Sequence, residues 1–245
     1  SREHLWSLGI PILVDLPGVG QNLQDHMRLQ VIYKSKRELP APSLLAEVAL
    51  FTKTRPSLLA SPPDLQINFS AGISELSPPE LAAIGSVSIF VPVLIQPQSR
   101  GVVQLSSANP QDPPIINPNY LHMATDVQAY IRSIEICREI ANTKAFADFN
   151  DGEVLPGINA NLEEYIRNNA DTIWHPVGTC KMGRDALSVV DPQLKVYGVE
   201  GLRVADASIM PTIPSGNTNA ACVMIGEKAA DMILNSQKAA LVAFA

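Results

Sequence analysis

The chain has 245 residues, of which 46% are hydrophobic and 17% are charged. This balance is typical of a globular, enzyme-like protein rather than a disordered one, and the length suffices for one large domain or two small ones. The net charge of −6 disfavours nucleic acid and anionic membrane surfaces as partners, and no run of 18 apolar residues predicts a transmembrane helix. Three widely spaced cysteines with no CxxC pair disfavour a disulfide framework or a zinc site and suit a reducing compartment: Cys137, Cys180 and Cys222.

The first part of the chain alternates short apolar elements with turns. Residues 1–8 are predicted to form a short helix that ends at Gly9, and residues 10–14 a brief apolar strand. Apolar and polar side chains alternate over residues 27–34, which indicates a half-buried strand. The apolar positions within residues 43–53 predict an amphipathic helix.

Further strands are predicted at residues 64–70, 86–95 and 101–105, with proline-rich loops between them. Because no crossover helices separate these strands, we expect an antiparallel sheet. Thr125 and Gln128 have the spacing of a capping box and predict a helix that runs to about residue 141. One stripe of this helix is apolar: Val127, Tyr130, Ile131, Ile134, Cys137 and Ala141.

The last third of the chain is predicted to contain three short elements. Asn161 is expected to open a short helix, by the same capping logic as the preceding one. Residues 202–205 predict a short strand that ends at an acidic residue. Asn219 is placed to cap a final helix over about residues 220–234.

Four motifs carry most of the functional information. They are WHPVGTCKMG at residues 174–183, LRVADAS at 202–208, GNTNAA at 216–221 and LPGVGQNLQDH at 16–26. Together they resemble the C-terminal part of the glucose-methanol-choline (GMC) family of flavin oxidoreductases. Their sequences are most similar to the choline dehydrogenase and aliphatic alcohol dehydrogenase branch. The resemblance extends over nearly the whole chain.

The resemblance implies an α+β fold with an antiparallel substrate-domain sheet flanked by helices, plus C-terminal strand-loop-helix pieces of an FAD-binding domain. Residues 1–26 would belong to the FAD domain, 27–170 would form the substrate-binding domain, and 171–245 would carry the active-site segment and return to the FAD domain. The glycines of Gly18-Val19-Gly20 lack the third glycine of a dinucleotide fingerprint. The family carries its nucleotide-binding βαβ core upstream, so we expect a fragment, or one partner of a split enzyme, that lacks its N-terminal FAD-binding half.

His175 is the candidate general base. Taken alone, a histidine beside tryptophan and proline is more often structural. Pro176 favours an extended conformation at His175 and Gly178 permits a tight reversal, so the imidazole is expected on a rigid turn, where it can act as a base near neutral pH. In the resembled family the histidine of this motif accepts the proton of the substrate hydroxyl. The other histidines are expected to be surface, loop or structural residues: His4, His26 and His122.

Asn219 is the second catalytic candidate. The position of Asn219 before a predicted helix indicates only a helix cap. The resembled family places histidine or asparagine here, paired across the active site with the histidine that corresponds to His175. An amide cannot act as a base, although it can hydrogen-bond the substrate oxygen and the flavin edge. By resemblance, the first N–H groups of the final helix, near the small Ala220 and Ala221, face the negative edge of the reduced flavin.

Three further residues are cofactor candidates. The resemblance places Asp206 and Ala207 against the flavin ribityl and pyrophosphate region, although an acid after an apolar strand is often a helix cap or salt-bridge partner. It also implies that Trp174 packs against the flavin ring, whereas a large aromatic side chain is equally often ordinary core. The cofactor expected from these residues is FAD.

The leading hypothesis is FAD-dependent oxidation of a primary alcohol to an aldehyde, in which His175 removes the hydroxyl proton while hydride passes to flavin N5. A hydroxynitrile lyase on the same fold is one alternative, although such members usually carry histidine where this chain has Asn219. A catalytically inert fragment that needs its N-terminal half is the other. The alcohol and the electron acceptor, quinone or oxygen, stay open. The expected location is cytoplasmic or peripheral to the inner membrane.

Overall fold

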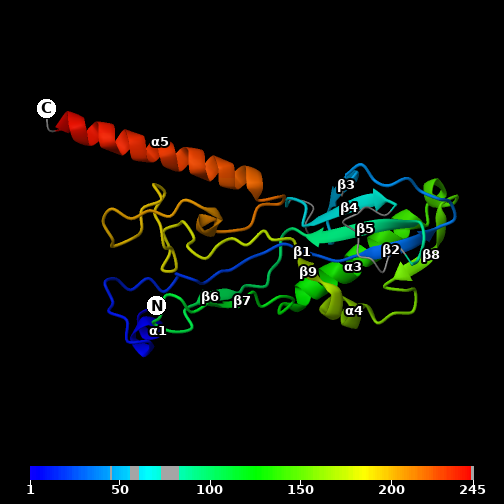
Figure 1. Cartoon of the computed structure of the whole chain (residues 1–245), viewed down its shortest axis with the longest axis horizontal. Helices are drawn as coiled ribbons and strands as arrows, with labels where there is room; N and C mark the ends of the chain where they lie inside the picture. Colours follow the sequence, from blue (N-terminus) through cyan, green and yellow to red (C-terminus); the bar gives the residue numbers. More distant parts are fainter. Residues whose placement is uncertain (45, 56–60, 73–82, 244–245) are drawn as a thin grey trace. The chain divides into compact units, whose positions relative to one another are not determined.

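The computed structural model describes residues 1–44, 46–55, 61–72 and 83–243, and it contains two compact units (Figure 1). The first unit consists of residues 1–25, 99–120 and 174–245, and the second of residues 26–98 and 121–173. Residues 99–120 thus pack with the two terminal segments, which differs from the predicted boundaries of 27–170 for one domain. The assignment of the units to FAD and substrate binding remains a prediction.

The second unit is built on an antiparallel sheet, as predicted. Five strands follow one another in the order β3-β4-β5-β1-β9: Val48–Thr52, Leu65–Ala71, Val87–Leu94, Met27–Arg28 and Asp171–Thr172. Two more extend it, since β2 (Val31–Ser35) pairs with β5 and with β8 (Asn150–Leu155). β5 is the central strand and is almost wholly buried, because its β-branched and aromatic side chains pack on both faces.

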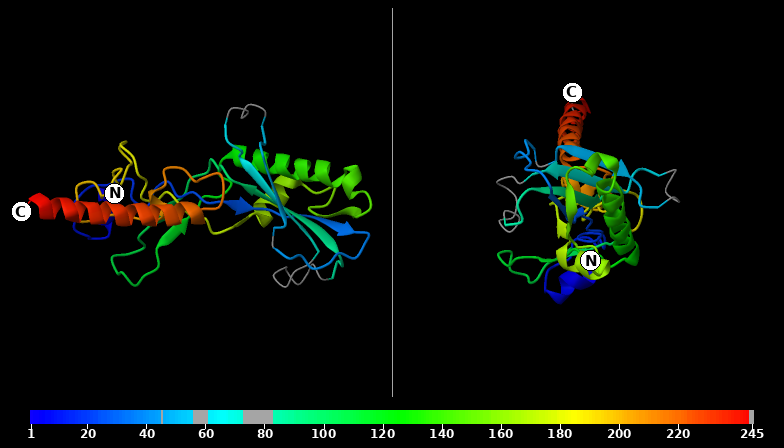
Figure 2. Two further views of the ribbon diagram at one scale, coloured as in Figure 1. Left: turned by 90° about the horizontal axis from the view of Figure 1, so that it is seen from above. Right: turned by 90° about the vertical axis from the view of Figure 1, so that its right-hand side faces the viewer.

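Helix α3 (Ala124–Ala141) covers one face of this sheet, and the shorter α4 (Leu162–Asn169) packs beside it (Figure 2). The predicted apolar stripe is confirmed, because Val127, Tyr130 and Ile134 are buried against strand residues such as Val31 and Phe90. A 3₁₀ turn, η2 (Lys144–Phe146), follows α3. The predicted capping box is wrong: Met123 is the N-cap of α3 and no side chain caps it. Packing rather than capping therefore fixes where α3 lies.

One buried ion pair joins α3 to β8. Arg138 binds both carboxylate oxygens of Glu153 at 2.8 Å, and the Tyr33 hydroxyl donates to the same carboxylate at 3.0 Å. The Glu153 side chain is only 4% exposed. Burial, reinforced by Glu153, raises the pKa of Tyr33, and burial raises the pKa of the neighbouring Cys137 thiol to about 12. The phenol and the thiol are therefore neutral at physiological pH.

The first unit has few regular elements. They are α1 (Arg2–Ser7), a two-stranded sheet of β6 (Val102–Gln104) and β7 (Ile115–Asn117), a 3₁₀ turn η3 (Ala207–Ile209), and the long α5 (Asn219–Ala243). A hydrophobic core in this unit joins η3 and the first turns of α5 to the loops before them, with Val177, Val190, Ile209, Ile213 and Ile225 among its buried members. Helix α5 runs beside the loops of this unit (Figure 1) and packs against η3.

Three predicted elements are wrong. Residues 48–52 form strand β3 instead of a helix, because they pair along their length with β4; residue 45 of that predicted helix lies outside the described residues. Residues 10–14 form no strand, since no neighbouring strand pairs with them in the described part of the chain. Residues 202–205 make only an isolated bridge, between Arg203 and Lys195.

Candidate active site

The three segments that carry the predicted site residues share one core in the first unit. Backbone N–H groups of Gly178, Cys180 and Met182 donate to the carbonyls of residues 207, 208 and 209 at 3.3, 2.8 and 2.7 Å. The His175 motif therefore runs beside η3. Ala221 and Cys222, at the start of α5, pack into the same hydrophobic cluster as Val177. The fold thus gathers the segments at 174–183, 206–210 and 219–222.

Asp25 holds the backbone of His175. The His175 N–H donates to Asp25 Oδ1 at 2.8 Å, and the Tyr120 hydroxyl donates to Asp25 Oδ2. Two antiparallel bonds next to this contact, at 2.8 and 3.0 Å, join the backbones of Val177 and Gln24. Asp25 is only 8% exposed. The backbone that carries the imidazole is therefore held in place, as the Pro-Val-Gly sequence predicts. The residue that holds it, Asp25, is not among the predicted site residues.

The partly buried environment of His175 favours the unprotonated form of its imidazole. Partial burial lowers the pKa of His175 from its ordinary value, and the Asp25 carboxylate opposes this shift. Because the ordinary pKa of histidine is about 6.5, the lowered value leaves the imidazole unprotonated at neutral pH. An unprotonated imidazole can accept a proton, which a general base requires.

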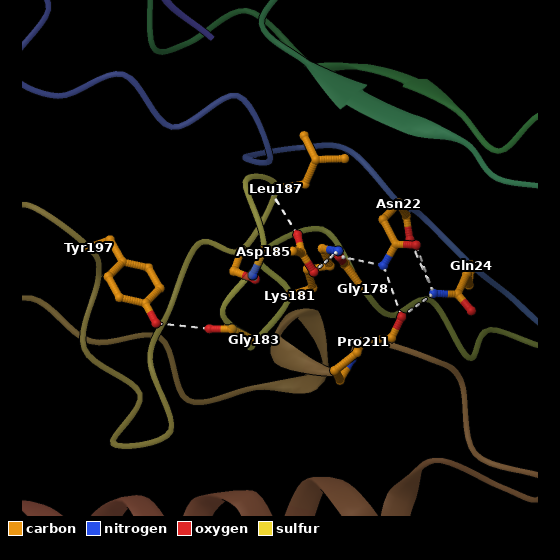
Figure 3. A network of polar contacts seen from close by, with 10 residues as sticks. Asn22, Gln24, Gly178, Lys181, Gly183, Asp185, Leu187, Tyr197 and Pro211 are labelled. Carbon is orange, nitrogen blue, oxygen red and sulfur yellow. Dashed lines mark hydrogen bonds and ion pairs between the residues drawn. The ribbon is translucent and has the colours of Figure 1, made fainter.

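A polar network fixes the turn after His175 (Figure 3). The Asn22 side-chain amide donates to the carbonyls of Gly178 and Pro211, each at 3.2 Å, and that of Gln24 donates to Pro211 at 3.1 Å. The Gln24 side-chain oxygen accepts the N–H of Ile213 at 3.2 Å. Gly178 has a φ of +98°, and an added Cβ would lie 2.4 Å from the Asn22 carbonyl oxygen. Residues 22–24 thus tie the histidine turn to the loop that leads into α5.

Gly18 and Gly20 permit close backbone packing of the 16–26 segment. A Cβ at Gly18 would lie 2.0 Å from the Leu187 carbonyl oxygen. At Gly20, where φ is +78°, it would lie 2.0 Å from the Val103 carbonyl oxygen. These glycines therefore let the 16–26 segment run directly against the backbone of other segments.

Asn219 is the first residue of α5 rather than its cap. The carbonyl of Thr218 accepts the N–H of Cys222 at 2.9 Å, so Thr218 occupies the cap position. Asn219 and Ala220 are exposed and Ala221 is partly buried. The amide thus lies at the N-terminal end of a helix, as predicted, while its pairing with His175 remains a prediction.

The remaining candidates lie on loops and on η3. The Asp206 side chain caps η3 by accepting the N–H of Ser208 at 2.7 Å, which confirms the capping role that its sequence position left open. Trp174 has a φ of +60° and is 76% exposed, so it is not ordinary core of the described chain. A contact of either residue, or of Ala207, with a cofactor remains a prediction.

These residues suit a large planar cofactor with a negative edge. The N–H groups at the start of α5 carry partial positive charge, and the exposed side chains there are small or uncharged. A Cβ added at Gly216, on the loop before α5, would meet no atom within 4 Å. The exposed indole of Trp174 offers an aromatic face. The donor set fits a flavin.

The other histidines lie elsewhere. His26 is buried and its Nε2 is 3.2 Å from the carbonyl oxygen of Ile95, in accord with a structural role. His122 is exposed on a loop, as expected. His4 differs from expectation, because it lies on α1 with Nε2 buried rather than at an open surface.

Within the described ranges, no cluster of His, Cys, Asp and Glu could hold a metal ion. None of the described helices is long and apolar enough to cross a membrane.

Comparison with known proteins decides the family. A family model described as GMC oxidoreductase matches residues 97–226, which is more than half of the chain. The chain belongs to the GMC oxidoreductase family. As a GMC protein it is 40% identical over 97% of its length to an oxygen-dependent choline dehydrogenase of Klebsiella pneumoniae, and 37% identical over 95% to an alcohol dehydrogenase [acceptor] of Pseudomonas putida.

A solved structure has the same fold. The formate oxidase of Aspergillus oryzae, in a structure described as concerning FAD modification, superposes with a TM-score of 0.81 at 25% identity and covers 96% of this chain. This chain covers 50% of that structure, 47% of the Klebsiella protein and 46% of the Pseudomonas protein. The chain therefore spans about half the length of the relatives that it matches.

Proposed function

We propose that this chain is the C-terminal part of an FAD-dependent enzyme that oxidises a primary alcohol to an aldehyde. The observation that carries the proposal is that Asp25 fixes the backbone of His175, whose pKa is lowered by partial burial, on the core that also holds η3 and the start of α5. Membership of the GMC family and similarity to choline and alcohol dehydrogenases support it. FAD is supported by the printed description of the formate oxidase relative and by the fit of the donor set.

The roles of the residues follow from their chemistry. A bound FAD would supply the hydride acceptor at N5. His175 takes the hydroxyl proton of the alcohol, and Asp25 keeps the backbone of His175 in place. Asn219 donates a hydrogen bond to the alcohol oxygen. The N–H groups of Ala220 and Ala221 at the start of α5 offset negative charge at the cofactor edge.

Two segments would hold the rest of the cofactor. Asp206 and Ala207 would hold the ribityl and pyrophosphate region, on an η3 backbone that is fixed by the cap and by the bonds to residues 178–182. Trp174 would pack against the ring. The nucleotide-binding part comes from the remaining half of a protein of the relatives' length. The chain thus contributes the base and one side of the cofactor site.

The test is a flavin spectrum of the complete gene product, mixed without oxygen with choline and, separately, with a short primary alcohol. Oxidation predicts a yellow protein that bleaches with at least one alcohol. A yellow protein that releases cyanide from a cyanohydrin without bleaching would instead be a hydroxynitrile lyase. A colourless complete protein would contradict the proposal. Reoxidation of the bleached sample by air or by a quinone then separates an oxidase from a dehydrogenase.

A further inference from the structure

Gln24 is a buried residue to which the proposed reaction assigns no role. It is only 2% exposed, and burying an amide costs free energy unless its donor and its acceptor both have partners. The amide Nε2 donates to the Pro211 carbonyl at 3.1 Å and to Asn22 Oδ1 at 3.2 Å, and Oε1 accepts the Ile213 N–H at 3.2 Å (Figure 3). These partners fix the amide in one orientation, because a flip would set Oε1 against two oxygens.

The backbone of Gln24 is joined to the segment that carries His175. Its N–H donates to the Val177 carbonyl at 3.0 Å, and its carbonyl accepts the Val177 N–H at 2.8 Å. A Cβ added at Gly178 would lie 3.1 Å from Gln24 Nε2, so the glycine lets the histidine turn lie directly against the side-chain amide. One residue therefore contacts the histidine turn with its backbone and residues 211–213 with its side chain.

Residues 211–213 lead into the N-terminal end of α5. Ile213 is 5% exposed and shares a hydrophobic core with Ile225 of α5, so this segment is packed as well as hydrogen-bonded. Between it and Asn219, Pro214 restricts the backbone and Thr218 is buried. The place of the Asn219 amide therefore depends on where residues 211–213 are held.

We propose that Gln24 is a positioning residue that sets the spacing between the two candidate catalytic groups, His175 and Asn219. It acts through the backbone of each segment rather than on the substrate. Because a displacement of about 1 Å can lower the rate of a positioned reaction on the order of 100-fold, such a link bears on the chemical step. The inference rests on the proposed function in taking both groups to act on one alcohol.

The chemistry of the Gln24 side chain favours a role in geometry. An apolar side chain of similar length would fill the same space, so packing alone does not require an amide here. A buried polar network whose members all have partners specifies one arrangement of its segments, whereas each hydrogen bond adds little net stability. The amide of Gln24 therefore holds two segments in one register.

Flavin reduction tests this role in the complete protein, mixed without oxygen with a saturating primary alcohol. Gln24→Met keeps the length of the side chain but removes the contacts of the amide. It should retain flavin and slow reduction on the order of tenfold or more. In an Asn219→Ala background the same change should slow reduction by less than about threefold, because the group that Gln24 positions is already absent. An equal loss in the two backgrounds, or no loss in Gln24→Met, would overturn the inference.

Hydrogen exchange measures the same link without alcohol. The backbone amides between Pro211 and Asn219 should exchange on the order of tenfold faster in Gln24→Met, because the segment opens more often. Unchanged exchange would overturn the inference. If Gln24→Met does not fold, Gln24→Glu replaces it, since a carboxylate still accepts the Ile213 N–H but sets an oxygen against the Pro211 carbonyl.

Ser188→Ala is the matched control. Ser188 is 5% exposed and accepts the Asp185 N–H at 3.1 Å, so the change removes a buried hydrogen bond of the same unit that joins neither linked segment. It should leave both the exchange between Pro211 and Asn219 and the reduction rate nearly unchanged. Faster exchange in Gln24→Met with equal rate losses in the two backgrounds would overturn the inference and leave the proposed oxidation standing. An unsubstituted flavoprotein that no alcohol reduces would contradict the oxidation itself, and the inference with it.

Discussion

Asp25 is the residue on which the geometry of His175 depends. Its carboxylate accepts the His175 N–H at 2.8 Å and also the Tyr120 hydroxyl, so three segments of the first unit meet at one side chain. It also acts on the imidazole through its charge, because it opposes the lowering of the His175 pKa by burial. Asp25 therefore both positions the backbone of His175 and raises the pKa of its imidazole against the effect of burial.

Removing the charge at Asp25 should move the pH profile of the enzyme. Asp25→Asn keeps a side-chain oxygen that can accept the His175 N–H, but it removes the carboxylate that raises the His175 pKa. The acid limb of kcat/KM reports that pKa and should shift to lower pH. Asp148→Asn, in an exposed ion pair with Arg37, is the control. An acid limb that stays in place or moves to higher pH in Asp25→Asn would contradict this role.

Asn219 should matter for turnover more than for stability. Because Thr218 holds the cap position of α5, Asn219→Ala should leave Tm almost unchanged. Loss of its hydrogen bond to the substrate should lower kcat/KM roughly 10- to 100-fold. Asn219→His should keep flavin and partial activity, since the family uses either residue. Steady-state kinetics with Asn217→Ala as the control test the assignment of this role to Asn219. If Asn217→Ala is the damaging change and Asn219→Ala is harmless, the assigned position is off by two.

Among the elements, α3 and β8 are joined by the Arg138–Glu153 pair. Glu153→Gln leaves the Arg138 guanidinium without its carboxylate partner in a largely buried position. It should lower the free energy of unfolding by roughly 2–4 kcal/mol, somewhat below the cost for a fully buried pair, because Arg138 keeps part of its solvent contact.

The matched control lies on the same helix. Glu139→Gln breaks the exposed pair with Arg132 and should cost about 1 kcal/mol or less. Urea unfolding of the complete protein, followed by far-UV circular dichroism, compares the two variants. Equal destabilisation by both changes would show that the Arg138–Glu153 pair contributes no more than a surface contact.

Elements with a clear periodic or capping pattern are predictable from the sequence. Helix α3 shows a clear apolar period, and α4 is capped by Asn161, whose side chain accepts the Glu164 N–H at 3.3 Å as expected. Strand β3 differs from the predicted helix because the spacing of its apolar residues fits both structures, and only pairing with β4 decides between them. The brace at Asp25 shows the same limit within the site. His175 stands out by its motif, whereas Asp25 acts on it from 150 positions away.

At the scale of the whole molecule, the first unit has a buried hydrophobic core but also exposes large apolar side chains to solvent. Its site segments converge on one cluster, yet Trp6, Leu13 and Trp174 are 74%, 84% and 76% exposed. The relatives contain about as much polypeptide again as this chain, and we propose that such further polypeptide accounts for this contrast. We therefore expect the chain to supply the base and part of the cofactor site, and the rest of the protein to cover these surfaces.

The central claim is that His175 is the base of a flavin-dependent alcohol oxidation. The most direct measurement is the rate of flavin reduction on anaerobic mixing of the complete protein with a primary alcohol, for the unsubstituted protein, His175→Ala and the exposed-loop control His122→Ala. His175→Ala should keep its flavin and reduce it roughly 10²–10⁴-fold more slowly, whereas His122→Ala should match the unsubstituted protein. A loss below about fivefold in His175→Ala, with the flavin retained, would contradict the claim.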